Sequence, residues 1–169
     1  DYGLTSSTCT VASATSSTTP SYTRYYCPVA ASTTNTKVKD ASSGCEVQSG
    51  GDYRCYDRLT RMKDGMFTFL NSNNPTLDNV RVGLGHFSGY NSGTTNGDGS
   101  TGEILVAAKV LGAPGSTHRT ALKSAVAGLV ASAGTPSAHA FAEAAAYLMG
   151  TSTYSETQTY RDIAVEKQR

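Results

Sequence analysis

Four cysteines are the residues whose type and spacing point most clearly to a particular chemistry. They all fall in the first third of the 169-residue chain, among Ser, Thr, Gly and Tyr: Cys9, Cys27, Cys45 and Cys55. None forms the close pair that structural zinc sites use. Free buried thiols are the alternative, but this segment has almost no apolar residues with which to bury them. We therefore predict two disulfides, and the sequence leaves all three pairings open.

Tyrosine is the second residue type with functional potential. The chain has ten tyrosines and no tryptophan. Such side chains can cover disulfides and replace a missing hydrophobic core. When exposed, they offer a large contact area at low entropic cost and can still form hydrogen bonds, which suits an adhesive surface. Five tyrosines near the cysteines form our candidate contact surface, with the core role left open: Tyr22, Tyr25, Tyr26, Tyr53 and Tyr56.

Enzymatic chemistry finds little support in the sequence. The three histidines, His86, His118 and His139, are widely spaced, and neither a His-x-x-x-His pair nor a Gly-x-Ser-x-Gly elbow occurs. No pair of acidic residues stands out as a glycosidase couple, and nothing resembles a phosphate-binding loop. We expect no catalytic residues and therefore no enzyme.

Composition divides the chain into regions of different character. Residues 1–36 contain 17 Ser or Thr but one acid and one base, a composition that cannot by itself supply a packed core. We expect a long loop there, or a disulfide-tied lobe with short strands. The formal net charge of +1 gives no field that would gather nucleic acid. No apolar run approaches the roughly 20 residues that cross a bilayer, so we expect no membrane insertion.

From Asp57 onward the pattern predicts regular elements. An amphipathic helix is expected over residues 58–71, with Asp57 as its cap. Its apolar stripe contains Leu59, Met62, Met66, Phe67 and Leu70. Alternating small and branched residues predict a strand over residues 80–87 and a second over 103–111, joined as a hairpin by a glycine-rich loop.

Two further helices are predicted after the hairpin. The first is capped by Ser116 or Thr117 and ends near Gly134. The second begins at Thr135-Pro136, runs to Gly150 and has an inner face of four apolar residues: Phe141, Ala144, Ala145 and Leu148. The expected order is thus helix, strand, strand, helix, helix.

This order, with the stretches Val80-Arg-Val-Gly-Leu-Gly-His-Phe-Ser88 and Gly134-Thr-Pro-Ser-Ala-His-Ala-Phe-Ala-Glu-Ala144, resembles the von Willebrand factor A-type (VWA) domain of type IV pilus tip-associated adhesins, the PilY/PilC type. The resemblance covers about residues 57–150. It implies an α/β fold, a partial VWA-like (Rossmann-like) doubly wound sheet. Residues 1–56 would be a disulfide-containing Ser/Thr/Tyr-rich insertion, and residues 151–169 a polar C-terminal segment.

The resemblance also implies a metal site that this chain cannot complete. Of the family's ligands only the loop threonine is present, as Thr135, and no Asp-x-Ser-x-Ser motif occurs. Mg²⁺ or Ca²⁺ is therefore expected in an intact parent domain and no cofactor in this segment. We expect the chain to be cut from a longer protein at both ends, and not to complete the sheet alone. The alternative is that the chain forms a different, self-contained fold.

The function implied is that of an extracellular adhesin segment, exported through the periplasm to the cell surface, supporting attachment and pilus biogenesis. Its expected partners are pilus subunits and a host or abiotic surface. A structural subunit of an extracellular filament or surface layer is the alternative suggested by the Ser/Thr-rich, weakly charged composition. A secreted hydrolase with an unfamiliar site is a third.

Overall fold

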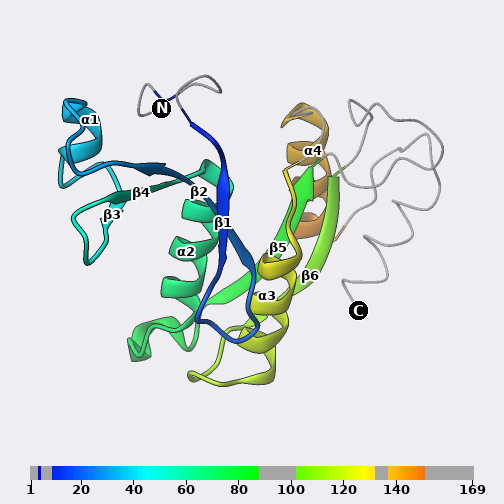
Figure 1. Cartoon of the computed structure of the whole chain (residues 1–169). Coiled ribbons are helices and arrows are strands. Elements are labelled where there is room, and N and C mark those ends of the chain that lie inside the picture. The colour runs from blue at the N-terminus through cyan, green and yellow to red at the C-terminus, as the bar shows by residue number, and fades with distance from the viewer. Residues whose placement is uncertain (1–3, 5–8, 88–101, 132–136, 151–169) are drawn as a thin grey trace. The chain divides into compact units, whose positions relative to one another are not determined.

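The computed structural model describes residues 4, 9–87, 102–131 and 137–150 (Figure 1). The chain divides into two compact units, residues 1–69 and residues 70–169. Each contains helices and an antiparallel sheet, and both disulfides lie in the first unit. The prediction of a mixed α/β fold is confirmed at this level. Every strand pairing among the described residues is antiparallel, so the doubly wound VWA sheet is not among the observed features.

The first unit is built on a four-stranded sheet in the order β1-β2-β4-β3. Short strands thus form where the sequence left a choice between a loop and a small lobe. Pro28 is tolerated in β2 because β1 pairs only with the first part of that strand, residues 23–26, so the missing N–H breaks no bond to β1. The strands are β1 (Ala12–Thr15), β2 (Thr23–Val29), β3 (Cys45–Val47) and β4 (Tyr53–Tyr56), with a short helix α1 (Thr36–Lys39) between β2 and β3.

The two disulfides are Cys9–Cys27 and Cys45–Cys55. Cys27 lies directly opposite Cys55 in the pairing of β2 with β4, and Cys55 lies opposite Cys45 in the pairing of β4 with β3. The second disulfide therefore links neighbouring strands, and the first ties the N-terminal segment to β2. The predicted disulfides are confirmed, and the structure selects one of the three pairings.

Helix α2 (Arg58–Leu70) matches the predicted helix within one residue. Its side towards the sheet of the first unit carries Thr60, Lys63 and Phe67, all buried. The Thr60 hydroxyl accepts a hydrogen bond from the Tyr25 amide of β2 at 3.0 Å. Met62, which the apolar stripe placed inside, is 41% exposed, so that part of the prediction is wrong. Thr60 is buried with the Tyr25 amide as its partner, and the buried Lys63 ammonium lies 5.4 Å from the centre of the Tyr22 ring.

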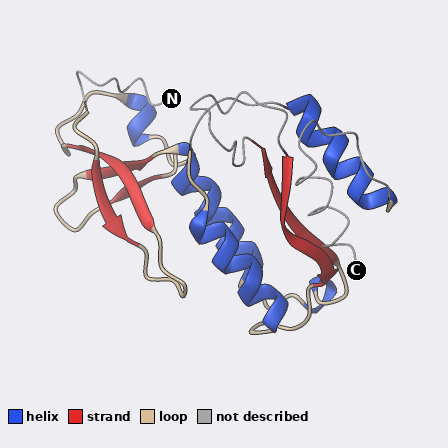
Figure 2. Ribbon diagram, turned by 90° about the vertical axis from the view of Figure 1, so that its right-hand side faces the viewer, coloured by secondary structure: helices blue, strands red, loops and turns tan. Residues whose placement is uncertain are grey.

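The second unit contains a hairpin of β5 (Arg81–Phe87) and β6 (Gly102–Val110), as the sequence predicts. A 3₁₀ turn, η1 (Pro75–Leu77), precedes it, and α3 (Thr117–Gly128) and α4 (Ser137–Met149) follow. Both helices contact both strands, and Figure 2 shows α4 lying along one side of the hairpin. Residues 104–108 of β6 are all half-buried, so neither face of this part of the strand is fully open to solvent.

The hairpin has a bulge opposite Gly83, where β6 carries an extra residue and the register shifts between Val82 and Leu84. A Cβ at Gly83 would lie 3.0 Å from the Val106 carbonyl oxygen and the Ala108 nitrogen. The Ala108 N–H donates instead to the Tyr147 hydroxyl of α4 at 2.7 Å. The bulge thus anchors α4 to β6.

Arg119 of α3 is the most deeply buried charged residue in the described part of the chain, at 0% exposure. Its Nη1 donates to the Leu70 and Ser72 carbonyls at 3.0 and 2.7 Å, and its Nε to the Gly112 carbonyl at 2.8 Å. The Nη2 atom pairs with Asp78 at 2.8 Å. One side chain therefore joins four chain segments of the second unit, which the apolar pattern could not foresee.

The two C-terminal helices depart from their predictions in detail. Ser116, one of the two residues predicted as the cap of α3, is its cap. The helix, however, ends at Gly128 and not near Gly134. On α4 the predicted inner face is wrong: Phe141 and Leu148 are each 77% exposed, whereas Ala146 is buried. The Tyr147 hydroxyl bond to β6 sets the rotation of α4, and this rotation turns Phe141 and Leu148 outward.

Replacing Arg119 should destabilise the chain strongly. In Arg119→Met the Leu70, Ser72 and Gly112 carbonyls and the Asp78 carboxylate lose their shared donor, and the free energy of unfolding should fall by about 3–5 kcal/mol. Lys123→Met, on the same helix with a single exposed hydrogen bond, should change it by less than about 0.5 kcal/mol. Urea unfolding measures both, and equal effects would contradict this role for Arg119.

A methyl group at Gly83 should also be costly. Gly83→Ala brings a Cβ against backbone atoms that cannot move aside, so we expect a loss of about 1–3 kcal/mol in unfolding free energy. Gly128→Ala is the matched control, because nothing lies within 4 Å of its Cβ position. Thermal unfolding should show a lower midpoint for the first variant only; a stable Gly83→Ala protein would argue against the close approach.

Candidate binding site in the disulfide-tied sheet

The five candidate tyrosines lie in two different environments. Tyr22 and Tyr56 are buried and belong to the core of the first unit. Tyr25 is 46% exposed, and Tyr26 and Tyr53 are half-buried. An exposed contact surface can therefore draw on Tyr25, Tyr26 and Tyr53, whereas Tyr22 and Tyr56 serve the packing role that the sequence left open.

A charged network fixes these tyrosines and holds α2 on the sheet. The Arg24 guanidinium of β2 bonds to Asp64 of α2 at 2.6 Å, to Glu46 of β3 at 2.8 Å and to the Tyr56 hydroxyl at 2.9 Å. It also lies 3.9 Å from the centre of the Tyr56 ring, within cation–π range. The Tyr22 hydroxyl donates to Asp64, and the Tyr56 hydroxyl donates to Glu46 at 2.8 Å. Three strands and one helix are thus joined through Arg24.

The network shifts the ionisation of its members. Burial and the hydrogen bond to Asp64 raise the pKa of Tyr22, and burial and the bond to Glu46 raise the pKa of Tyr56. Burial alone would raise the pKa of Glu46, but the hydrogen bonds from Arg24 and Tyr56 outweigh it and hold that pKa below its ordinary value. At neutral pH the tyrosines are therefore neutral donors and Glu46 is an ionised acceptor.

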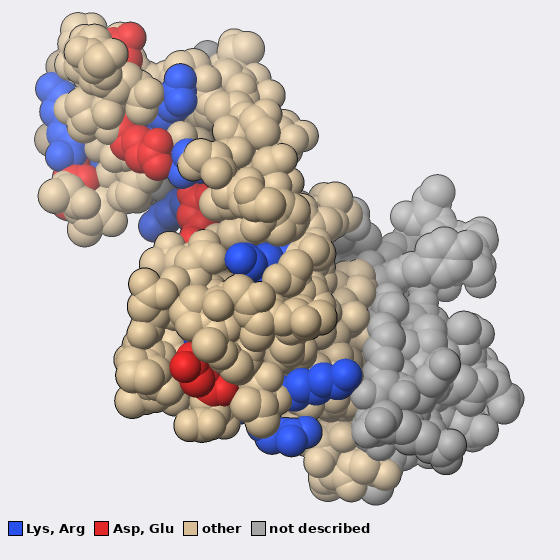
Figure 3. All heavy atoms as spheres, turned by 90° about the horizontal axis from the view of Figure 1, so that it is seen from below, with Lys and Arg blue, Asp and Glu red and all other residues tan. Residues whose placement is uncertain are grey.

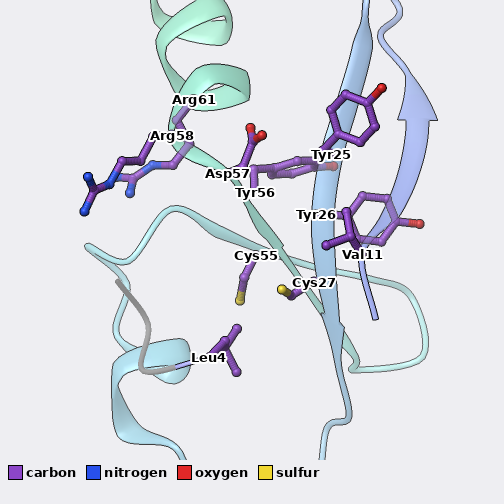
Figure 4. Close-up of a pocket in the computed structure, with 10 residues that line it drawn as sticks. All are labelled: Leu4, Val11, Tyr25, Tyr26, Cys27, Cys55, Tyr56, Asp57, Arg58 and Arg61. Carbon is purple, nitrogen blue, oxygen red and sulfur yellow. The ribbon is translucent and has the colours of Figure 1, made fainter. Parts of the chain in front are cut away.

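Beside this network the first unit has a hollow of about 330 Å³, drawn in Figure 4. This volume lies at the lower end of the range for small-molecule sites. Its lining is mainly apolar and aromatic, with charged side chains from the start of α2. We call it the tyrosine–arginine hollow, and its lining residues are Leu4, Val11, Tyr25, Tyr26, Cys27, Cys55, Tyr56, Asp57, Arg58 and Arg61.

The charged residues of the hollow come from one short stretch. Arg58 and Arg61 are three residues apart on α2, so they lie on neighbouring positions of one helix face. Figure 4 shows their side chains on one side of the hollow, and those of Tyr25 and Tyr26 on the other. The Asp57 carboxylate caps the helix by accepting a hydrogen bond from the Thr60 amide at 2.6 Å. Two cations and one anion therefore line the hollow.

Gly44 determines where the Arg61 side chain lies. Its φ is +75°, and a Cβ there would be 3.2 Å from the Arg61 Nε atom. The guanidinium of Arg61 thus lies over the backbone turn that precedes Cys45.

On the face drawn in Figure 3, basic and acidic side chains are interspersed and form no broad field of one sign. The pair of arginines is a local feature.

The sequence-based reasoning chose Tyr25 and Tyr26 but missed Arg58 and Arg61. The available signal was two arginines at helical spacing directly after a tyrosine- and cysteine-bearing strand. Thr135 lies outside the described residues, as does the side chain of His139. His118 is a structural residue, since its Nε2 lies 2.7 Å from the Val82 carbonyl oxygen.

In the ranges that the structure describes, no group of three or more His, Cys, Asp or Glu residues could hold a metal ion. None of the helices in the described segments is long and apolar enough to cross a membrane.

Comparison of the chain with protein-family models, with curated proteins and with solved structures gives no match in any of the three.

The Glu46 interactions should make stability depend on acid pH. Because its pKa is lowered in the folded state, Glu46 stabilises the fold above its ordinary pKa of 4.5, and this contribution is lost as pH falls through the lowered value. Its side chain is 48% exposed, so the contribution should not exceed about 1 kcal/mol. Urea unfolding of Glu46→Gln between pH 7 and 3 should show a shallower acid decline than the parent; superimposable declines would contradict this.

Proposed function

We propose that this chain is a segment of an extracellular bacterial adhesin at or near a type IV pilus tip. In this proposal residues 57–150 form the core segment of a VWA-like domain, and residues 1–56 are an insertion that carries the contact surface. The single observation that carries it is the order of α2, β5, β6, α3 and α4, the order that the resembling motifs require.

The sheet of the second unit is compatible with the same proposal. Among the described residues β5 has one hydrogen-bonded neighbour, β6, although helices contact both strands. A doubly wound sheet would add further strands, supplied from outside this segment. The metal site would need further ligands besides Thr135, and these would also come from outside this segment. The bound ion would be Mg²⁺ or Ca²⁺. The partners would be pilus subunits and a host or abiotic surface.

The disulfides support the proposed location. Two disulfides in a unit that is poor in aliphatic residues fit an oxidising compartment such as the periplasm and the cell exterior. In the proposal the disulfides keep the contact surface folded outside the cell. Among the described aromatic residues of the first unit, Tyr25 has the largest exposed fraction, 46%.

One observation favours a structural subunit of a filament or surface layer as a second candidate. Helix α4 exposes Phe141, Leu148 and Met149, at 77%, 77% and 70%. Exposed apolar side chains on one helix suit assembly with other chains. In the adhesin proposal the same side chains would face the remainder of the parent domain.

Attachment of beads coated with the whole chain tests the adhesin proposal. We expect them to bind host-cell layers or an abiotic surface more than albumin-coated beads do, and excess free chain to compete. Tyr25→Ser should weaken binding about tenfold, since an exposed interface aromatic contributes about 1.4 kcal/mol. Phe69→Ser is the matched control, an exposed aromatic of α2 outside the hollow.

The result decides between the two candidates. Attachment no greater than that of albumin beads on every surface would refute the adhesin proposal. Ordered polymers formed by the purified chain, together with an absence of attachment, would support the filament subunit.

A further inference from the structure

Three cysteines form a single row across the sheet of the first unit. Cys27 of β2 lies directly opposite Cys55 of β4, and Cys55 lies directly opposite Cys45 of β3. Residues that are directly opposite in an antiparallel sheet have their side chains on the same face. The middle cysteine, Cys55, therefore has a cysteine on each side but forms its disulfide with only one of them, Cys45.

The neighbour that is not bonded to Cys55 is also within bridging distance. The Cα atoms of directly opposite residues in an antiparallel pair are about 4.5–5.5 Å apart, and disulfides span Cα separations of about 4.4–6.8 Å. Both Cys27 and Cys55 line the tyrosine–arginine hollow, and Figure 4 shows their sulfur atoms next to each other there. A Cys27–Cys55 disulfide therefore requires no movement of the strands.

The two sulfurs of the Cys45–Cys55 disulfide differ in accessibility. Cys55 is 2% exposed, whereas Cys45 is half-buried and belongs to β3, an edge strand of the sheet. A thiolate opens a disulfide by attacking one of its sulfurs, and the rate depends on access to that sulfur. A thiol from solution therefore attacks Cys45 and displaces Cys55.

We propose that Cys45 is a site at which a small thiol modifies the chain, and that the row of cysteines then passes the exchange on to Cys9. In the first step the external thiolate attacks the Cys45 Sγ atom and forms a mixed disulfide there. The Cys45–Cys55 bond breaks, and Cys55 leaves as a thiolate.

In the second step the Cys55 Sγ atom attacks the Cys27 Sγ atom and forms a Cys27–Cys55 bond. The Cys9–Cys27 bond breaks, and Cys9 leaves as a thiolate that takes a proton from water. One thiol is consumed and one is released, and the number of disulfide bonds stays the same. The exchange therefore needs neither an oxidant nor a reductant besides the small thiol itself.

The exchange changes what the disulfides hold together. Before it, one bond ties the N-terminal segment to β2 and the other ties the edge strand β3 to β4. After it, the bond within the chain joins β2 to β4, which are already the two central strands. The N-terminal segment and the edge strand lose their covalent links. The inference concerns the first unit alone and does not depend on the adhesin proposal.

Disulfide mapping of the whole chain after reaction with reduced glutathione tests the proposal. The folded chain is incubated with an equimolar amount of glutathione, free thiols are blocked with iodoacetamide, and tryptic peptides are identified by mass spectrometry without reduction. Trypsin places each cysteine on a peptide of its own, residues 1–24, 25–37, 40–54 and 55–58. The peptide pairs therefore report every disulfide separately.

In chains that have taken up one glutathione, we expect it on Cys45, the blocking group on Cys9, and the peptides of Cys27 and Cys55 joined. The joined pair should outnumber blocked Cys55 by about tenfold or more, because an attack on a neighbour held opposite in the sheet outruns a reagent in solution. Glutathione on Cys45 with Cys55 left as a thiol, attachment mainly at another cysteine, or no uptake would overturn the proposal.

The unfolded chain is the matched control for the mapping. In concentrated urea the strand register is lost, so glutathione should distribute over all four cysteines with no preference for the Cys27–Cys55 pair. The same pattern with and without urea would show that the row of cysteines does not direct the exchange.

Two double variants test the geometry without an external thiol. Cys9→Ser with Cys45→Ser keeps only Cys27 and Cys55, and we expect dissolved oxygen to join them within one chain. Cys9→Ser with Cys55→Ser keeps Cys27 and Cys45, which are two strands and about 9–10 Å apart, so both should stay as thiols. A bond in both variants, or in neither, would contradict the proposal. The mapping uses the unaltered chain, so it does not depend on how these variants fold.

Discussion

The first unit depends on the guanidinium of Arg24, because its sheet has too few aliphatic side chains to hold a helix by burial alone. One planar group reaches Asp64 on α2, Glu46 on β3 and Tyr56 on β4, and the aromatic rings of Tyr22 and Tyr56 fill the space around it. The hollow exists because this network sets α2 at a fixed place on the sheet. Ion pairs, aromatic packing and disulfides together stabilise this unit, as a leucine-rich core stabilises other domains.

Arg119 plays the corresponding part in the second unit, where it collects backbone carbonyls that would otherwise be unsatisfied at the ends of their elements. The sequence pattern could not predict the structural roles of Arg24 and Arg119, because it assigns interior positions to apolar residues. A buried arginine is tolerated only where every donor has a partner, and those partners come from segments far apart in the sequence. Only the folded chain shows that they converge.

The elements themselves were largely predictable. The bounds of α2, the β5–β6 hairpin and the capping role of Ser116 follow from periodicity, alternation and capping chemistry, which are local. The disulfide pairing and the rotation of α4 were not, because they depend on strand register and on one hydroxyl bond from Tyr147. For the site, the tyrosines were identifiable from their number near the cysteines. The arginines were missed because a charged helix start is ordinarily a solvated surface.

The two disulfides also determine how the chain responds to a pulling force. Between Cys9 and Cys27, and between Cys45 and Cys55, the sequence separations are 18 and 10 residues. At roughly 3.4 Å per extended residue, these closed loops withhold on the order of 90 Å of contour length from a chain stretched by its ends. While both bonds are intact, the first unit can lose its hydrogen bonds under load and still stay that far below its full extended length.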